Sequence, residues 1–415
     1  MLMPVAVVNS HGAGRIRAGH PWIFRQDVVR GPDTDAATGG PSVVEVRDGR
    51  GKSLGAATWA ARAKLALRML TREAPPGEDR PAPELLALVS GRLDAALARR
   101  DPLGRERDAY RVVHGESDGL PGLFVDRYAD AAVIQTTSVA MDAARAPIAA
   151  LVRDRLGARV VVARDDGSTR DFEGLPRFAG VVAGDGPTAV VYRLGANELE
   201  ADLLTDGKTG GFLDQADNHA AVAALAPPGA RCLDAFTYHG GFALALARRG
   251  GAVRAVDQDP QAVARAAANA RRNGLANLEV QARNAFDLLR ELESAGERFD
   301  VVVLDPPALA KRGGSGGGGS AGGGGGAAAL AAAERGYKEL ILRGARLTGA
   351  GGLLVACSCS GRITRAHWDE ICAEALADSG RSAQVLARNG AGRDHPELCG
   401  VPETGHLKVW ILRML

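Results

Sequence analysis

Residues 231–260 read RCLDAFTYHGGFALALARRGGAVRAVDQDP, and this stretch decides the fold of the C-terminal half of the chain. Residues 231–235 and 253–257 are apolar runs of strand length, and Gly240-Gly241 lies between them where a helix begins. The alternation continues with a helix expected over 260–273 and strands expected over 278–282, 301–304 and 353–357. Runs of Val and Leu separated by helices predict a doubly wound α/β domain whose mostly parallel sheet is covered on both faces.

Length and composition exclude several classes of protein. The chain has 415 residues, so two or three domains are expected, and 46% hydrophobic and 24% charged residues are typical of a globular protein. Five cysteines without paired spacing argue against a disulfide scaffold, and no Cys/His cluster has zinc-ligand spacing. The longest apolar runs have strand length, and the N-terminus lacks the layout of a signal peptide. These features predict a cytoplasmic protein with no membrane segment and no metal.

Breaks in composition predict three domains. Residues 1–74 read as a small β-rich unit, 84–196 as an α+β middle domain and 197–415 as the doubly wound domain, with a Pro-rich linker over 75–83. In the middle domain, strands alternate with one helix expected over 142–156. A glycine-rich tract, residues 313–326, interrupts the last domain and predicts a mobile loop.

The charge is unevenly distributed along the chain. Residues 1–72 hold 11 Lys/Arg against 5 Asp/Glu, a net of +6, which leaves −4 for the remainder because the whole chain carries +2. A small basic unit on a near-neutral body is typical of a nucleic-acid anchor, since Lys and Arg displace counterions from phosphates. A solvated basic face is the other interpretation, and charge alone does not separate the two.

The glycine pair at the first strand-to-helix turn predicts a ligand site. Glycine lets the backbone approach a ligand, and the following helix offers unpaired N–H groups. Asp257 ends the next strand, 17 positions beyond Gly240, where a carboxylate can accept hydrogen bonds from both hydroxyls of a ribose. Asp234 suits the cationic amino-acid end of a ligand better than a diphosphate, and a GxGxxG fingerprint is absent. The alternative is a structural glycine turn with a helix-capping aspartate.

A second candidate site follows the strand FDVVVL, residues 299–304, which ends in Asp305-Pro306-Pro307. Proline fixes φ and has no N–H, so Pro306 and Pro307 predict a rigid wall against which a planar base can rest beside Asp305. In open α/β sheets, ligands bind at the carboxyl ends of central strands. This motif therefore predicts a reaction centre.

The next strand should bring a thiol to the same edge, because it ends in Cys357-Ser358-Cys359-Ser360-Gly361. A strand cysteine is usually a small buried hydrophobe. Cys359 lies where the chain leaves the sheet, so we expect it to be the functional thiol and Cys357 to lie deeper as a structural residue.

Motifs along nearly the whole chain carry a family resemblance. In order they are Gly14-Arg15, Gly19–Phe24, Arg111–Glu116, Asp118–Leu123, Val125–Tyr128, Lys208–Gly210, Phe212–Gln215, Asp305–Pro307, Arg335–Lys338, Ser358–Gly361, Asp394–Pro396 and Leu407-Lys408. The chain thereby resembles the bacterial large-subunit ribosomal RNA cytosine-5 methyltransferases, in which an RNA-binding PUA domain precedes a class I methyltransferase domain. The resemblance implies a Rossmann-like fold for 197–415, a PUA-like fold for 1–74 and S-adenosylmethionine as cofactor.

The resemblance also implies roles for individual residues. Those expected to bind S-adenosylmethionine are Phe212, Asp214, Asp234, Tyr238, Gly240, Asp257 and Asn284, and those expected to bind RNA are Arg15, Lys208, Pro306 and Pro307. Asn284 stands where the family commonly has an adenine-contacting aspartate, and its amide can still pair with the base edge. Ala216 and His219 stand where the family usually has arginines, which weakens any RNA contact there.

The implied chemistry starts from the weak nucleophilicity of carbon 5 of cytosine. A Cys359 thiolate that adds to carbon 6 makes carbon 5 enamine-like, so that it can accept a methyl group. Asp305 is expected to hydrogen-bond the N3 or amino edge of the base, which must first be unstacked from the RNA. The residue that removes the carbon-5 proton is not identified.

Other functions remain open from the sequence. An exocyclic-amine methyltransferase of guanine or adenine is the runner-up, because Asp-Pro-Pro serves that chemistry too, although such enzymes commonly place an aromatic residue where Ala308 stands. A non-catalytic RNA-binding factor of ribosome assembly fits the basic N-terminal unit as well, and an NAD-dependent dehydrogenase comes last. A homodimer is also left open.

Overall fold

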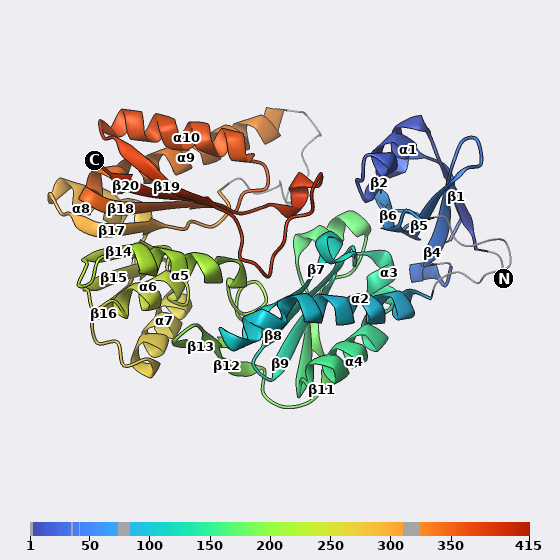
Figure 1. The fold of residues 1–415 in the computed structure, drawn as a ribbon, viewed down its shortest axis with the longest axis horizontal. Helices are drawn as coiled ribbons and strands as arrows, with labels where there is room; N and C mark the ends of the chain where they lie inside the picture. The colour runs from blue at the N-terminus through green and yellow to red at the C-terminus, as the bar shows by residue number, and fades with distance from the viewer. Residues whose placement is uncertain (1–2, 35, 41, 74–83, 310–323) are drawn as a thin grey trace. The chain divides into compact units, whose positions relative to one another are not determined.

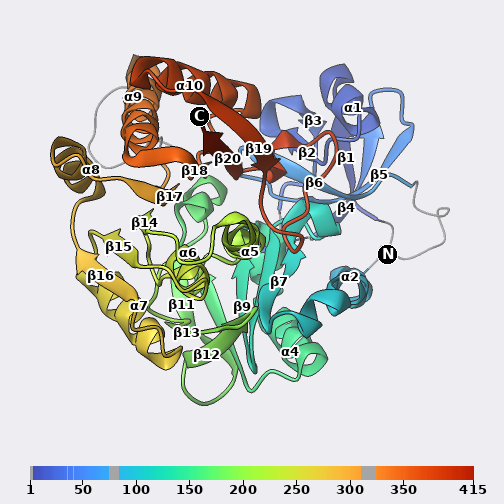
Figure 2. The same cartoon turned by 60° about the vertical axis from the view of Figure 1, so that its left-hand side comes forward.

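A computed structural model describes the chain except for residues 1–2, 35, 41, 74–83 and 310–323. The described part forms two compact units (Figures 1 and 2). The first comprises Met1–Tyr192, Ala201–Gly211 and Asp394–Thr404, and the second comprises Arg193–Glu200, Phe212–Arg393 and Gly405–Leu415. The domain bounds expected from the sequence, 1–74, 84–196 and 197–415, stay predictions. The expected linker over 75–83 and most of the glycine tract over 313–326 lie outside the described residues.

The first unit begins with a six-stranded sheet in the order β2-β6-β5-β4-β1-β3. Its strands are β1 (Val5–Val8), β2 (Trp22–Phe24), β3 (Val28–Arg30), β4 (Val43–Asp48), β5 (Ser53–Trp59) and β6 (Leu65–Thr71). The expected β-rich unit is therefore confirmed. Helix α1 (Ser10–Arg17) was not expected, because it contains two glycines. It is stabilised by Asn9, whose side chain accepts a hydrogen bond from the Gly12 N–H at 2.8 Å, and by burial of Ile16.

A five-stranded sheet in the order β11-β10-β9-β8-β7 follows in the same unit. Its strands are β7 (Ala109–His114), β8 (Leu123–Tyr128), β9 (Ala131–Thr136), β10 (Val160–Asp165) and β11 (Phe178–Gly184), and α2 (Leu85–Arg100) precedes them. The single helix expected over 142–156 was wrong, because α3 (Val139–Ala143) and α4 (Arg145–Leu156) are separated at Ala144. The reason is Pro147, whose ring would clash with the carbonyl group four residues earlier in a continuous helix.

The two sheets of the first unit are joined by buried contacts. Arg68 on β6 forms two hydrogen bonds to the Glu173 carboxylate, at 3.1 and 2.7 Å, and both residues are buried. The indole N–H of Trp22 donates to Glu116 at 2.8 Å. Breaking such a buried ion pair leaves one uncompensated charge, so these contacts tie the N-terminal sheet firmly to the middle sheet.

The second unit contains a seven-stranded sheet in the order β16-β15-β14-β17-β18-β20-β19. Its strands are β14 (Cys232–Ala235), β15 (Val253–Asp257), β16 (Leu278–Ala282), β17 (Phe299–Leu304), β18 (Thr348–Ser358), β19 (Ala383–Asn389) and β20 (Lys408–Met414). The five strands expected from the sequence are confirmed as β14 to β18, all parallel. β20 returns antiparallel between β18 and β19, and neither of these last strands was expected. A hairpin of β12 (Ala189–Leu194) and β13 (Asn197–Asp202) precedes this sheet in the chain.

Helices cover both faces of this sheet, which confirms the doubly wound α/β fold (Figures 1 and 2). On one face α8 (Ala285–Ser294), α9 (Gly324–Leu347) and α10 (Arg365–Ser379) share a hydrophobic core with the strands. On the other face lie α5 (Ala216–Leu225), α6 (Gly241–Ala247) and α7 (Pro260–Arg272). In the described part of the chain, no helix is long and apolar enough to span a membrane.

Candidate functional site

The strand register of the second unit brings the candidate residues to one edge of the sheet. Ala235 of β14 lies beside Leu304 of β17, and Leu304 lies beside Ala356 of β18. The residues that follow each strand therefore emerge side by side at the carboxyl ends. The adjacency of Asp305 and the thiol-bearing strand, expected from the sequence, is confirmed.

Asp234 is a buried carboxylic acid in the middle of this edge, with only 1% of its surface exposed. Its Oδ2 accepts hydrogen bonds from Thr237 Oγ1 at 2.7 Å and from the Ala243 N–H at 3.0 Å. Oδ1 is also buried and has no hydrogen-bond partner among the described residues. Burial, helped by the charges of Asp305 and Asp257, raises the pKa of Asp234 to about 7. An acid in these surroundings is suited to a cationic ligand group.

The glycine turn has the strained backbone that close approach to a ligand requires. Gly240 caps α6 with φ +92°, and Tyr238, two residues earlier, has φ +50°, which a bulky residue adopts only under constraint. Asp257 supplies that constraint, because its Oδ2 accepts from the Tyr238 N–H at 3.0 Å and its Oδ1 from the Asp259 N–H at 3.0 Å. Each oxygen keeps a further lone pair that can accept a ligand hydroxyl.

The remaining cofactor candidates differ in how they are held. The Phe212 ring packs edge-on against Tyr238, with 4.8 Å between centroids. Asp214 is buried and its carboxylate lies 3.0 Å from His406 Nε2. Asn284 is exposed at the start of α8, where its side-chain oxygen accepts from the Phe286 N–H at 2.9 Å, so its NH₂ group is left as a donor. Their roles in binding a cofactor stay predictions.

The Asp-Pro-Pro segment and Cys359 lie together. Cys359 Sγ is 3.9 Å from the carbonyl oxygen of Pro306, and the thiol is partly exposed. Cys357 has 1% of its surface exposed, and burial, with the neighbouring Asp305 carboxylate, raises the pKa of its thiol well above the ordinary value. The expected difference in depth between the two cysteines is confirmed. Pro306 is buried, whereas Pro307 is exposed and Asp305 is half-buried, so the acid and the Pro307 part of the wall are open to a ligand.

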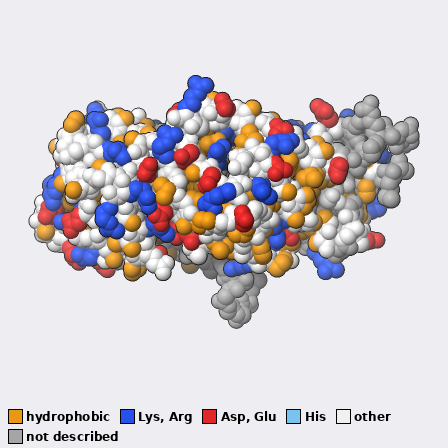
Figure 3. Space-filling view, turned by 90° about the horizontal axis from the view of Figure 1, so that it is seen from below, with side chains coloured by type: hydrophobic (Ala, Val, Ile, Leu, Met, Phe, Trp, Pro, Cys, Tyr) orange, Lys and Arg blue, Asp and Glu red, His pale blue; other side chains and the backbone are white. Residues whose placement is uncertain are grey.

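Arg15 and Lys208 belong to the first unit. Arg15 Nε donates to the Trp22 carbonyl at 3.1 Å and its guanidinium lies 5.3 Å from the centre of the Phe24 ring, while Lys208 is exposed. On the face of the molecule seen in Figure 3, basic, acidic and apolar side chains are interspersed. RNA contact by either residue stays a prediction.

Three residues near Cys359 and Cys357 were not singled out from the sequence. Gln215 is buried, and its Nε2 has no hydrogen-bond partner among the described residues, although the amide lies near the Cys357 thiol. Tyr337 and Lys408 are also buried and contact the segments around Cys359. In the sequence, only their place in the motifs that carry the family resemblance pointed to these residues, and the resemblance assigned them no role.

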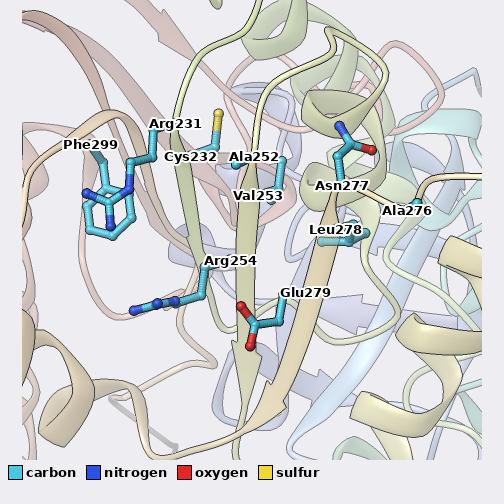
Figure 4. Close-up of a pocket in the computed structure, with 10 residues that line it drawn as sticks. All are labelled: Arg231, Cys232, Ala252, Val253, Arg254, Ala276, Asn277, Leu278, Glu279 and Phe299. Carbon is cyan, nitrogen blue, oxygen red and sulfur yellow. The ribbon is translucent and has the colours of Figure 1, made fainter.

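A separate hollow of about 420 Å³ opens at the amino ends of β14, β15 and β16 (Figure 4). Arg231 lies over the Phe299 ring there, 4.5 Å from its centre, and pairs with Glu297 at 2.6 Å. Because the strands are parallel, this hollow is at the opposite edge of the sheet from Asp234 and Cys359. In the described residues, no group of three or more His, Cys, Asp and Glu is arranged to hold a metal ion.

Comparisons with known proteins agree with this arrangement. A PUA-like domain model matches residues 6–72, and a model described as a methyltransferase domain matches residues 227–389. The ribosomal RNA large subunit methyltransferase I of Aeromonas hydrophila is 35% identical over 404 residues, which is 95% of both chains. The protein of the same name from Erwinia tasmaniensis is 31% identical over 95% of this chain and 96% of its own. The structure of SMU.776, described as a methyltransferase and complexed with SAH, matches all of both chains with a TM-score of 0.79 at 17% identity, a likeness of fold.

Proposed function

The chain belongs to the ribosomal RNA large subunit methyltransferase I family, and from this premise we propose that it methylates carbon 5 of a cytosine in large-subunit ribosomal RNA through a covalent adduct with Cys359. At the level of the family, the activity is S-adenosylmethionine-dependent methylation of large-subunit ribosomal RNA. The target atom and the covalent step are our proposal. The observation that carries them is the partly exposed Cys359 thiol at 3.9 Å from the Pro306 carbonyl.

The cofactor is S-adenosylmethionine, and the residues at the carboxyl edge fit it. The buried, unpaired Oδ1 of Asp234 offers an acceptor to an ammonium group. Asp257 ends the neighbouring strand, where its free lone pairs suit ribose hydroxyls. When bound, S-adenosylmethionine supplies an electrophilic methyl group. We propose that Phe212, Tyr238, Gly240 and Asn284 complete its site and that Asp214 supports it through His406.

Cys359 rather than Cys357 is the proposed nucleophile because only a thiolate adds readily to carbon 6. Burial keeps the Cys357 thiol protonated and out of reach. Addition of the Cys359 sulfur to carbon 6 moves electron density to carbon 5, which can then accept the methyl group. After the carbon-5 proton leaves, the thiolate is eliminated and the aromatic ring is restored.

Asp305, Pro306 and Pro307 are proposed to hold the base during this addition. Pro307 is exposed, so a base that has left the RNA stack can rest on its ring, with the buried Pro306 fixing the backbone behind it. The half-buried Asp305 is then placed to hydrogen-bond the polar edge of the ring as its charge changes. We propose that the RNA backbone is bound by Arg15 of the PUA-like unit and by Lys208. We also propose that the protein acts in the cytoplasm.

The test combines product identification with trapping. Wild-type protein, ribosomal RNA and S-adenosylmethionine should yield 5-methylcytidine in mass analysis of nucleosides, and Cys359→Ala should yield none while still binding the cofactor. RNA with 5-fluorocytosine at the target should trap the wild type as a covalent adduct, because fluorine cannot leave as a proton does, and Cys359→Ala should form no adduct.

Cys357→Ala is the matched control. It trims a buried side chain and should cost stability of about 1 kcal/mol, yet it should keep activity and adduct formation. An active Cys359→Ala protein, or an adduct on Cys357, would contradict the proposal. A methyl group on an exocyclic nitrogen would favour the runner-up chemistry, and cofactor binding without any transfer would favour an assembly factor.

A further inference from the structure

Tyr337 places a hydroxyl group in the hydrophobic core between α9, α10 and the sheet. Only 1% of the residue is exposed, and its ring packs edge-on against Trp368, with 5.2 Å between centroids and an interplanar angle of 85°. Packing of this kind needs only a ring, and a buried hydroxyl costs free energy unless it is hydrogen-bonded. The partners of the hydroxyl therefore show what it does here.

The hydroxyl joins the two segments that flank the reaction centre. The Leu309 N–H, two residues beyond Pro307, donates to Tyr337 Oη at 3.4 Å. On the other side the hydroxyl is near the side chain of Ser358, the last residue of β18, which acts to lower the pKa of Tyr337. Burial raises the pKa of Tyr337 to about 12, and the charges of Cys359 and Asp305 add to the rise, so the hydroxyl stays protonated and lies near both groups.

The residue after Cys359 is held as firmly as the residue before it. Ser358 Oγ accepts from the Ser360 N–H at 3.3 Å. Lys408 Nζ, buried beside the end of β18, donates to the Ser360 carbonyl at 2.6 Å and to the Ile363 carbonyl at 2.8 Å. Cys359 is thus fixed on both sides, with its sulfur opposite the Pro306 carbonyl.

We propose that Tyr337 is a positioning residue for the Cys359 nucleophile. Its hydroxyl, which accepts from the Leu309 N–H on one side and is near Ser358 on the other, sets the separation between the proline wall that receives the base and the thiol that attacks it. The role rests on the proposed function, and Tyr337 itself touches neither base nor cofactor. Attack requires the reacting atoms to be about 3–3.5 Å apart in the bound complex, and a misplacement of about 1 Å can cost a hundredfold in rate.

The direct test is Tyr337→Phe, which keeps the ring and removes the hydroxyl. We expect kcat to fall by about ten- to a hundredfold, with S-adenosylmethionine affinity within about twofold of wild type. The single-turnover rate of adduct formation with 5-fluorocytosine RNA should fall in parallel. Ser358→Ala should show at least the same defect, because Ser358 Oγ also accepts from the Ser360 N–H. The double variant should be no slower than Ser358→Ala alone, because Tyr337 and Ser358 act through the same contact.

Trp368→Phe is the structural control. It trims the ring that packs against Tyr337, and the indole N–H has no hydrogen-bond partner among the described residues. We expect a lower melting temperature and wild-type kcat. If Trp368→Phe loses as much kcat as Tyr337→Phe, packing rather than positioning explains the effect and the proposal is wrong.

The remaining outcomes separate this proposal from the proposed function. Wild-type kcat and adduct rate in Tyr337→Phe, while Cys359→Ala is inactive, would overturn the positioning role alone. Activity in Cys359→Ala would overturn the nucleophile itself. If Tyr337→Phe does not fold, Ser358→Ala decides by the same measurements, and an unimpaired Ser358→Ala overturns the proposal.

Discussion

At the scale of single residues, Asp234 is the group whose surroundings say most about the cofactor site. One carboxylate oxygen is fully bonded within the turn, while the other is buried without a described partner. Burial raises the pKa of the acid to about 7, so near neutral pH the empty site holds a mixture of protonated and ionised Asp234. A cationic ligand group binds the ionised form better, and its binding is therefore linked to release of a proton.

We predict that S-adenosylmethionine affinity of the wild type rises between about pH 6 and pH 8, by less than tenfold per pH unit. The pKa of Asp234 is higher in the folded protein than in the unfolded chain, so the stability of the cofactor-free protein should fall as pH rises from about 4 through 7. Asp234→Asn should remove the pH dependence of both cofactor affinity and stability. Calorimetric titration and denaturant unfolding across this range measure the two effects. The control is Asp300→Asn, which should keep the wild-type pH dependence of affinity and stability. The Asp300 carboxylate lies at the opposite edge of the sheet, where it accepts from the Arg231 N–H. A wild-type affinity that does not change with pH would contradict the assignment.

At the scale of elements, the approach of α5 to the start of α6 shapes the glycine turn. A Cβ atom on Gly241 would lie 2.3 Å from His219 Cε1, and the His219 ring packs edge-on against Phe242 at 4.5 Å. His219 stands where the family resemblance led us to expect arginine. In this chain the position serves helix packing, which agrees with the weaker expectation of RNA contact there.

We predict that Gly241→Ala lowers the free energy of unfolding by about 1–3 kcal/mol, because the added methyl group must displace the His219 ring. His219→Ala in the same protein should recover part of this loss, since it opens the space. Urea denaturation of the two single variants and the double variant measures the coupling. Strictly additive effects would show that the two helices do not compete for this space.

At the scale of the whole molecule, the basic N-terminal sheet is part of the first compact unit. Val43, Ala56 and Leu70 of this sheet share a hydrophobic core with the middle sheet, and Arg68 is paired with Glu173. Deleting residues 1–72 would therefore uncover apolar surface, and RNA binding is better tested by neutralising exposed charges. Arg25, Arg62 and Lys64 are exposed, and the Arg25 N–H donates to the Lys64 carbonyl at 2.7 Å, so these two cations are neighbours.

We predict that changing Arg25, Arg62 and Lys64 together to Gln weakens RNA binding and lowers the slope of log K against log salt concentration by about 2 to 3. The reason is that each lost phosphate contact removes the release of about one counterion. Lys338→Gln is the control, because that lysine is on α9 and pairs with Glu374 and Asp378. An unchanged salt dependence in the triple variant would reject this surface as the RNA contact.

The sequence by itself determined the features that depend on local pattern. The strands β14 to β18 could be predicted because a strand buried on both faces must be a continuous apolar run. The turn at Gly240 could be predicted from the glycine itself, because glycine is favoured where the backbone has a positive φ, and the φ found there is +92°. The different exposure of Cys357 and Cys359 followed from their places inside and beyond the end of a strand.

Only the tertiary structure decided which groups meet around the thiol. β20 enters the sheet antiparallel beside β18 and carries Lys408 to Ser360, 48 positions away in the chain. Tyr337 reaches Leu309 from 28 positions away, and His406 reaches Asp214 from 192. A residue's local pattern fixes its burial and its backbone angles, because these depend on near neighbours in the chain. Its hydrogen-bond partners depend on where distant segments return, so they became visible only when the sheet was assembled.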